Sequence, residues 1–239
     1  MPDGHLLCEL HAHTTWSDGY LTLPELIDLY GRHEFDVLCI TDHVVRLDDP
    51  MTTAVDPWTW PGYLRAVRAE ARRALDEYGL LVIPGLELTD NHRDDPNRSA
   101  HALAIGLERH IAVDEGILTA LEAANEQGAA LVAAHPYCAG DSTPLRLTRR
   151  IATELESFRE LIHRYELFNR YEVFSWVAEE RLPAVASGDV HRNAHLASWK
   201  TLVPCEKDPA ALVDYLRSRG RVFLMPFALD QREPVPLAA

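Results

Sequence analysis

The sequence predicts an α/β domain whose parallel strands can close into a barrel. Short apolar runs alternate with longer amphipathic stretches along most of the chain, and this pattern is typical of repeated strand-then-helix units. The 239 residues, 47% of them hydrophobic, suffice for one large core and lie within the size range of α/β barrels. We see no internal repeat, low-complexity tract or linker in the sequence, so we expect a single domain over residues 1–239.

Seven short apolar runs are expected to form the strands. In chain order they are Leu6–Leu10, Val37–Thr41, Leu81–Leu86, Ala102–Ile105, Ala129–Ala134, Glu166–Phe168 and Ala184–Ala186. Cys8 and Cys39 fall inside two of these runs, where a reduced cysteine acts as a small buried hydrophobe. We therefore assign no chemistry to the four scattered cysteines.

Helix signals lie between the runs. Apolar side chains recur at i, i+3, i+4 and i+7 from Leu23 to Tyr30, which predicts an amphipathic helix with Pro24 in its first turn. Asp114 and Asp208 are suitable N-caps, and glycines mark the ends of the two helices that follow them. The expected helices, with their caps, are Leu23–Gly31, Tyr63–Tyr78, Asp114–Gly128, Leu147–Tyr165 and Asp208–Gly220.

The charge balance narrows the class of ligand. Acidic side chains number 37 against 23 basic ones, so the formal net charge is −14. This charge opposes non-specific attraction to nucleic acid and to anionic membranes, and a small substrate fits better. The first residues show no basic stretch followed by an apolar run, and no segment is apolar for long enough to cross a bilayer. We expect a cytoplasmic protein, whose oligomeric state the sequence does not predict.

Histidines and carboxylates follow most of the predicted strands. Those just past a strand end are His11, His13, His43, Glu87, His135, Asp189 and His191, whereas His101 lies at the start of the fourth run. Since strand ends converge on one face of a parallel barrel, these side chains can meet in one pocket. A lone histidine is more often a loop or core residue, but this combination is the ligand set of Zn, Mn and Fe sites.

The spacing of two pairs has geometric value. Side chains two apart on an extended segment project to the same side, so His11 and His13 can bind one ion together. Asp189 and His191 repeat this spacing after the last predicted strand. A turn role for Asp189 and a surface role for His191 would be the simpler interpretation of that pair alone.

These residues belong to a longer pattern. It runs His11-Ala-His13-Thr-Thr-Trp-Ser-Asp18-Gly19, Ile40-Thr41-Asp42-His43, Gly85-Leu-Glu87, Ala134-His135-Pro136 and Ser187-Gly188-Asp189-Val-His191. The pattern resembles that of the polymerase and histidinol phosphatase (PHP) family, and its opening and threonine-aspartate-histidine motifs are the most specific. No polymerase segment is evident, so the chain resembles the stand-alone members.

The resemblance implies a distorted, TIM-like (β/α)7 barrel with two or three divalent ions, Mn, Fe or Zn, at the carboxyl ends of the strands. It implies one ion bound by His11, His13, Glu87 and Asp189, a second by Glu87, His101 and His135, and a third by Asp18, His43 and His191. His92 is the alternative to His101. We expect Glu87, Asp189 and His191 to be the catalytic residues among these ligands.

The expected charge of the pocket favours an anionic substrate. Three divalent ions outweigh three ligand carboxylates, and a hydroxide bridging the ions is the expected nucleophile. We therefore expect a metal-dependent phosphoesterase, above all a phosphomonoesterase of a small phosphorylated metabolite or nucleotide. The leaving alkoxide would be protonated by a metal-bound water or by a nearby histidine such as His195.

Loop residues are the candidates for substrate recognition. Arg46 lies in a long segment with Trp58, Trp60 and Tyr63, although packing of these aromatics against the barrel is the simpler interpretation. The other candidates are Arg93, Arg98, Arg192, His195 and Lys200. Asp42 is expected to accept a hydrogen bond from a ligand imidazole or to stabilise a turn.

Three alternative functions remain open. A phosphodiesterase or 5′–3′ exonuclease on short oligonucleotides would be expected to carry a basic track, which the composition does not indicate. A non-catalytic metal-binding module would not need nine polar groups around its ions. An amidohydrolase also begins with histidine-x-histidine, but it typically adds a carboxylated lysine, and no lysine precedes Lys200.

Overall fold

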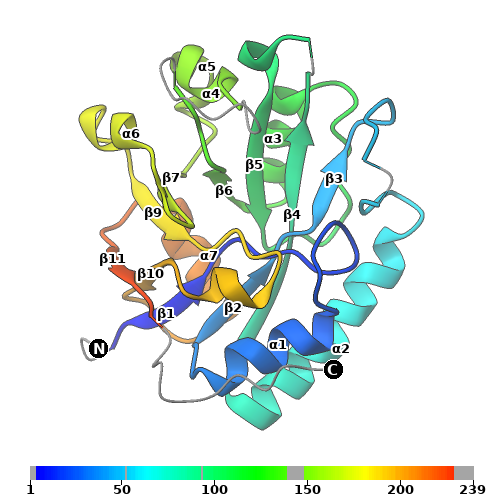
Figure 1. The fold of residues 1–239 in the computed structure, drawn as a ribbon, viewed down its shortest axis with the longest axis vertical. Helices are drawn as coiled ribbons and strands as arrows, with labels where there is room; N and C mark the ends of the chain where they lie inside the picture. Colours follow the sequence, from blue (N-terminus) through cyan, green and yellow to red (C-terminus); the bar gives the residue numbers. More distant parts are fainter. Residues whose placement is uncertain (1–3, 52, 93, 139–147, 229–239) are drawn as a thin grey trace.

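A mixed β-sheet with helices on both faces forms the framework of the molecule (Figure 1). The computed structural model describes residues 4–51, 53–92, 94–138 and 148–228. The strands are β1 Leu6–Glu9, β2 Val37–Ile40, β3 His43–Val45, β4 Leu81–Asp90, β5 Ala100–Ile105, β6 Ala130–Ala133, β7 Arg164–Asn169, β8 Glu172–Val173, β9 Ala184–Ser187, β10 Trp199–Val203 and β11 Phe223–Pro226. The helices are α1 Leu23–Arg32, α2 Trp60–Tyr78, α3 Ile117–Glu126, α4 Arg150–Thr153, α5 Leu155–Phe158, α6 Ser175–Glu179 and α7 Pro209–Arg217.

The strand order is β11-β10-β1-β2-β4-β5-β6-β7-β8, with β3 also paired to β4 and β9 to β7. Two parallel groups, β1-β2-β4 and β6-β7-β9, are joined by β5, which runs antiparallel to both β4 and β6. β10 and β11 add an antiparallel edge beside β1. The predicted α/β class is confirmed, and the curled sheet is consistent with a TIM-like barrel. The sheet is mixed, however, whereas the prediction was a parallel (β/α)7 barrel.

A short seam between the first and last parallel strands brings the ends of the curled sheet together. Ala12, just after β1, faces Val190, just after β9, in an isolated parallel bridge. Below it, the Thr201 hydroxyl of β10 accepts the Ala186 N–H of β9 (2.9 Å) and donates to the Ala186 carbonyl (2.7 Å). The seam therefore places the residues after β1 directly beside those after β9.

The helices begin where local chemistry favours them. Thr22 and Glu25 form a reciprocal capping box at the start of α1, and the Asp208 carboxylate accepts the N–H groups of Ala210 and Ala211 at the start of α7. Within the described residues, no helix combines the length and apolar character needed to span a bilayer.

Two apolar clusters cover the two faces of the sheet. Leu7 of β1 packs in a cluster with the buried faces of α1, α2 and α3, whereas its neighbours Leu6 and Cys8 pack with Leu212 and Leu216 of α7. This alternation is the period of two expected for a strand that is buried on both faces.

Two helix predictions need correction. Residues 147–165 were expected to form one helix, but the described part contains the short helices α4 and α5 followed by β7, because Tyr165 pairs with both Ala133 and Ala184. Sheet pairing here overrides local propensity. α3 begins at Ile117 after Gly116, and the expected cap Asp114 instead accepts the Leu47 N–H (2.8 Å).

Candidate metal centre

The seam aligns two segments that carry predicted ligands. His13 N–H donates to Val190 O (2.8 Å), and Val190 N–H donates to His11 O (3.0 Å). Since residues two apart on an extended segment project to the same side, this bridge brings His11 and His13 together with Asp189 and His191. Asp189 Oδ1 lies 3.7 Å from His11 Nε2 and 3.5 Å from His13 Nε2.

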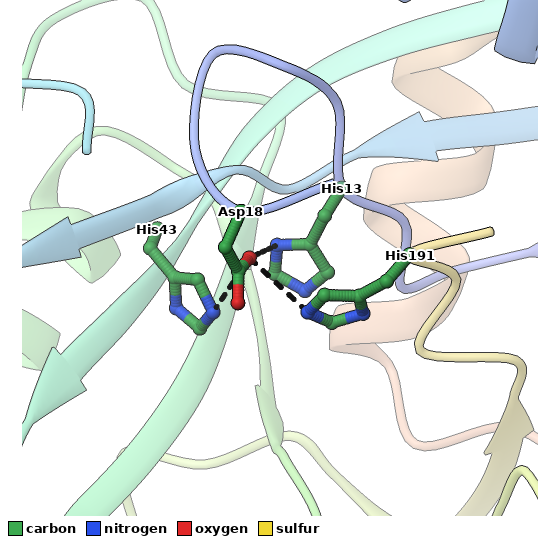
Figure 2. A group of neighbouring side chains, drawn as sticks. All are labelled: His13, Asp18, His43 and His191. Carbon is green, nitrogen blue, oxygen red and sulfur yellow. Dashed lines mark ion pairs between the residues drawn. The ribbon is translucent and has the colours of Figure 1, made fainter. Parts of the chain in front are cut away.

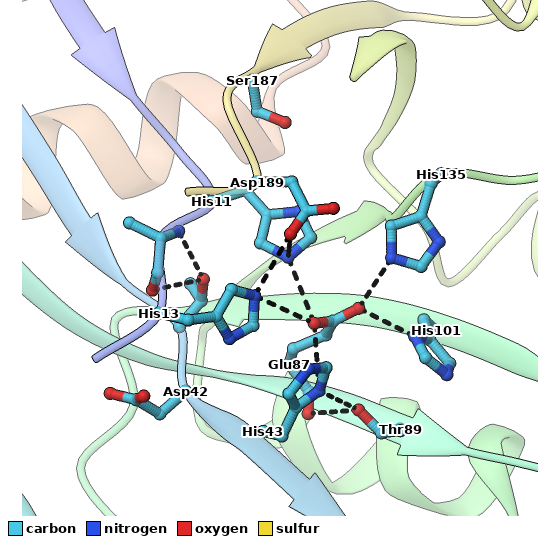
Figure 3. A network of polar contacts seen from close by, with 12 residues as sticks. His11, His13, Asp42, His43, Glu87, Thr89, His101, His135, Ser187 and Asp189 are labelled. Atoms are coloured by element: carbon cyan, nitrogen blue, oxygen red, sulfur yellow. Dashed lines mark hydrogen bonds and ion pairs between the residues drawn. The ribbon is translucent and has the colours of Figure 1, made fainter. Parts of the chain in front are cut away.

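Glu87 lies at the centre of a ring of imidazoles (Figure 3). It was expected just past a strand, but it lies within β4, which continues to Asp90 by pairing with β3 and β5. Its carboxylate is fully buried. Its nearest ring nitrogens belong to His101 (2.9 Å), His11 (3.1 Å), His43 (3.1 Å), His135 (3.1 Å) and His13 (3.3 Å).

Asp18 lies among a second group of imidazoles, those of His13, His43 and His191 (Figure 2). Its Oδ1 lies 3.1 Å from His191 Nε2, 3.5 Å from His43 Nε2 and 3.9 Å from His13 Nδ1. The Asp18 side chain is 43% exposed, whereas the side chain of His13 is fully buried. Asp18 therefore marks the side from which a ligand can enter.

The antiparallel course of β5 explains the position of His101. Its place at the start of a predicted strand did not fit a parallel barrel, in which ligands follow strand ends. Because β5 runs antiparallel to β4, Thr89 near the end of β4 pairs with His101 near the start of β5. His101 therefore lies on the same rim as the others, and the alternative, His92, is paired with Asp90 (3.2 Å).

Two predicted ligands lie on backbone that L-residues rarely adopt. His135 has φ of 30° and Asp189 has φ of 43°, both in the left-handed region. Charged side chains hold these segments: Glu166 accepts the His135 N–H (2.6 Å), and Arg170 Nε donates to the Asp189 carbonyl (2.8 Å). Strained residues persist where their surroundings determine them, and they cluster at functional sites.

Glu166 is a functional candidate that the sequence analysis missed. This fully buried carboxylate on β7 lies 3.0 Å from His11 Nδ1 and accepts hydrogen bonds from Asn169 Nδ2 and the Ser187 hydroxyl. It leaves His11 Nε2 directed at Glu87, as expected of a carboxylate that orients a ligand imidazole. A glutamate inside a short apolar run was the available signal, because isolated buried carboxylates are rare.

Asp42 acts on the loop that carries Asp18 rather than directly on an imidazole. Its carboxylate accepts the Thr14 N–H (2.8 Å), the Thr14 hydroxyl (2.8 Å) and the Ser17 hydroxyl (2.6 Å). Ser17 Oγ in turn lies 3.5 Å from His13 Nδ1. The expected turn role of Asp42 is present, and its link to a ligand passes through Ser17.

Opposite charges in the site shift each other's protonation. Burial opposes the charge on His13, yet the nearby carboxylates of Asp189 and Glu87 raise its pKa to about 9. Burial would likewise raise the pKa of Glu87, but the imidazoles of His43 and His11 hold it well below its usual range. The pKa of Asp189 is also lowered well below its usual range, since His11, His13 and Arg170 outweigh the effect of burial. This donor set therefore favours positive charge at its centre.

Solved structures share the fold of this chain. No family model and no curated protein matches the sequence. A two-domain protein from Bacteroides vulgatus that contains a predicted PHP-like metal-dependent phosphoesterase aligns with a TM-score of 0.65 at 21% identity, covering 93% of this chain and 66% of that one. The chain therefore spans just under two thirds of this neighbour.

Two further structures have the same fold. One, from Bifidobacterium adolescentis, is described as a metal-dependent phosphoesterase, with a TM-score of 0.51 at 16% identity over 78% of this chain and 88% of that chain. The other is called an amidohydrolase from Chromobacterium violaceum, with a TM-score of 0.54 at 16% identity over 92% of this chain and 97% of that chain.

The chain has the fold of the PHP-like phosphoesterases. This finding confirms the resemblance predicted from the sequence motifs, and at these identities the likeness is one of fold. The neighbours' names differ in the reaction they state, so the fold does not by itself specify the bond that is cleaved.

The donors of this site fit divalent ions. Three groups place one ligand atom from each member within 4.8 Å of one another: His13 with Asp18, His43 and His191; His11 with His13 and Asp189; and His11 with Glu87 and His135. Imidazole and carboxylate are the ligands that Zn, Mn and Fe share. His13 Nε2 is buried without a hydrogen bond among the described residues, which is the environment of a nitrogen aimed at a cation.

Two of the predicted substrate-binding residues, Arg192 and His195, lie beside the ligand candidate His191. Arg192 Nε and His195 Nε2 lie 3.0 Å apart, and His195 Nδ1 accepts the His191 N–H (3.2 Å). Burial, with Arg170 and His191 close by, lowers the pKa of His195 to about 4, so its ring is neutral at pH 7. Arg98 is exposed on a short 3₁₀ turn, and Arg93 lies outside the described residues.

Other candidates are engaged elsewhere. Arg46 binds Asp48 (2.8 Å) and lies 3.3 Å from His92 Nε2. Trp60 and Tyr63 are buried in the core, as the packing interpretation expected, and Trp58 is 79% exposed. The prediction that Lys200 contacts the substrate is wrong, because its side chain is fully buried against Glu9.

Arg170 is the rim cation that the sequence analysis missed. Its Nη2 lies 3.0 Å from Asp189 Oδ1 and 2.8 Å from His191 Nδ1, and the side chain is 17% exposed. It follows β7 directly, so the strand-end logic could have included it.

Proposed function

We propose that this chain is a metal-dependent phosphomonoesterase that binds two or three divalent ions through the nine predicted ligands. The observation that carries the proposal is the alignment of His11 and His13 with Asp189 and His191 across the seam, around the buried carboxylate of Glu87. Ions bound there would supply Lewis acidity toward a phosphate ester and toward water.

The residues around the ligands would hold them in the orientation that ion binding requires. Glu166 accepts from His11 Nδ1 and so leaves Nε2 as the ligand atom. Arg170 holds the Asp189 backbone and places a guanidinium at the rim, where it can pair with an anionic substrate. Arg46, Arg93, Arg98, Arg192 and His195 remain proposed substrate contacts.

A small substrate fits the chain better than a polynucleotide. The net charge of −14 repels extended polyanions, so attraction must come from the local field of the site. A short 5′-phosphorylated oligonucleotide distinguishes the two activities, because a phosphomonoesterase removes only the terminal phosphate and an exonuclease shortens the chain.

The decisive experiment is a substrate screen with a ligand variant as control. The Mn²⁺-loaded protein is assayed against phosphomonoesters, bisphosphates and short oligonucleotides beside Glu87→Gln. We expect phosphate release from at least one compound and at least a roughly 100-fold loss in the variant, since removing one charged group at a reacting centre commonly costs that much. Equal release by both proteins would refute catalysis by this site and leave a metal-binding module.

Hydrolysis of a C–N bond is the second candidate, because one structural neighbour is called an amidohydrolase. Lys200 is paired with Glu9 and does not belong to any of the three donor groups, so a carboxylated lysine ligand has no support among the described residues. Activity toward amides without activity toward phosphate esters would favour this candidate.

A further inference from the structure

A buried charge pair lies next to the proposed metal centre and is not used by it. Glu9 ends β1, two residues before His11, and Lys200 lies on β10; neither side chain has exposed surface. Lys200 Nζ lies 2.6 Å from Glu9 Oε2 and donates to Ser198 Oγ (2.7 Å). Cys8 pairs with Thr201 in the antiparallel register of β1 and β10, and Glu9 and Lys200 are the next residues along the two strands.

Both oxygens of Glu9 are occupied by donors from different parts of the chain. Oε1 accepts the N–H of His11 (3.1 Å) and the N–H of Gly188 (2.8 Å). Oε2 accepts the Tyr30 hydroxyl (2.8 Å) and faces Lys200. One oxygen atom therefore joins the backbone at the first predicted ligand to the backbone immediately before Asp189.

The pair packs directly against the backbone at Gly188. A Cβ atom at this position would lie 2.5 Å from Glu9 Oε2 and 2.6 Å from Lys200 Nζ, closer than atoms can approach. A side chain here would displace the carboxylate or the ammonium group, so glycine allows both to lie close to the start of the Asp189 segment.

Stability alone is a poor explanation for such a pair. Removing two charges from water is costly, and apolar residues of similar size are often as stabilising as a buried ion pair. We propose that Glu9, with its charge balanced by Lys200, is a positioning residue that holds the His11–His13 and Asp189–His191 segments at the separation that the ions require. This inference rests on the proposed metal centre.

The test compares two double variants of the full chain, Glu9→Gln/Lys200→Met and Glu9→Leu/Lys200→Met. Both remove the two charges together, so neither leaves an unpaired buried ion. Glutamine keeps an oxygen for the two N–H groups, whereas leucine has similar size and no acceptor. Free Mn²⁺ is measured by electron paramagnetic resonance while each protein is titrated.

We expect the glutamine variant to bind Mn²⁺ within about threefold of the wild-type affinity, and the leucine variant to bind at least about tenfold more weakly, as for other groups that orient ligands. Arg164→Met is the matched control, because Arg164 is also buried and donates to a backbone carbonyl, at Leu216 (2.9 Å). Circular dichroism establishes that each variant is folded at the assay temperature.

Two results would overturn the positioning role: wild-type affinity in the leucine variant, or an equal loss in Arg164→Met. If the leucine variant does not fold, Gly188→Ala replaces it in the test, because the added methyl group crowds Glu9 and Lys200 without changing their charges. Unchanged Mn²⁺ affinity in Gly188→Ala would also overturn the positioning role. If the wild-type chain binds no Mn²⁺, the proposed metal centre itself fails, which is a distinguishable outcome.

Discussion

Single buried side chains carry much of the organisation around the site. Glu166 satisfies a ring nitrogen of His11 and the backbone N–H of His135, which has positive φ. Ser17 connects Asp42 to His13 in the same indirect way. Metal affinity should therefore depend on residues that never touch an ion.

Replacement of Glu166 tests this dependence. In Glu166→Gln one carboxylate oxygen is replaced by an NH₂ group, which then faces a group that donates a hydrogen bond in the wild type. We expect His11 to lose its fixed orientation as a result. We expect Mn²⁺ affinity to fall by about 10–100-fold, measured by competition with a chelating dye. Glu179→Gln, the same change on an exposed residue, should leave affinity unchanged; equal effects in both would contradict the assigned role.

His163 provides a residue-scale test of stability against pH. Its Nδ1 accepts the Leu131 N–H (2.9 Å), and burial, followed by the nearby Arg217 and Arg219, lowers its pKa to about 4. The unfolded chain takes up this proton near pH 6.5 but the folded chain does not, so this contribution is complete above about pH 6.5 and is lost as the pH falls toward 4.

In His163→Asn the amide oxygen can accept the same N–H without titrating. We expect the free energy of unfolding in urea to fall less between pH 7 and pH 5 in the variant than in the wild type. Comparing the two proteins removes the effect of all other titrating groups. Identical slopes would show that His163 does not contribute.

At the scale of elements, the sequence predicts the position of strand β5 but not its antiparallel direction. All seven strand runs predicted from local apolar patterns correspond to observed strands. The direction of β5 depends on pairing between distant segments, so no local pattern carries it. β3, β8, β10 and β11 were missed for a related reason, since strands this short or this close to an edge have little periodicity.

The nine predicted ligands came from motifs and were brought together by the fold. The supporting residues Glu9, Glu166 and Arg170 were not predicted. The positions of Glu166 and Arg170 in and after a predicted strand were visible in the sequence, but the contacts that define all three roles are formed with distant residues. The helix at residues 147–165 failed for the same physical reason, as partners across the sheet decided the conformation of β7.

The cap of α7 offers a test at this scale. Asp208 accepts two N–H groups at the start of the helix, so Asp208→Ala should lower the free energy of unfolding by about 1 kcal/mol, whereas Asp208→Asn should lower it less. Chemical denaturation measures both. Because α7 packs on one face of the sheet through Leu212 and Leu216, we expect Mn²⁺ affinity to stay the same in both variants. A loss of affinity together with the loss of stability would contradict this expectation.

At the scale of the whole molecule, binding of ions should couple to folding. The donors come from segments spread between His11 and His191, and they converge only in the folded chain. Free Mn²⁺ at 100 times its dissociation constant should stabilise the fold by about 2.7 kcal/mol. Thermal unfolding with and without a chelator measures this effect, and Glu87→Gln should show a much smaller shift; equal shifts would indicate binding elsewhere.

The affinity for ions should also depend on pH. Because the pKa of His13 is raised to about 9, a proton must leave this ring when a cation binds near or below neutral pH. Affinity is therefore expected to rise from pH 6 to pH 9. Calorimetry in buffers of different ionisation enthalpy should detect proton release on binding, and its absence would contradict this assignment.

The bridge between Ala12 and Val190 has a consequence for observing the site without any substrate. Its two amides, His13 N–H and Val190 N–H, lie next to proposed ligands on opposite sides of the seam. Deuterium should replace these two hydrogens more slowly once cations join the two sides, while amides of distant helices keep their rates. Exchange at two positions would thus report occupancy directly, even before any reaction is known.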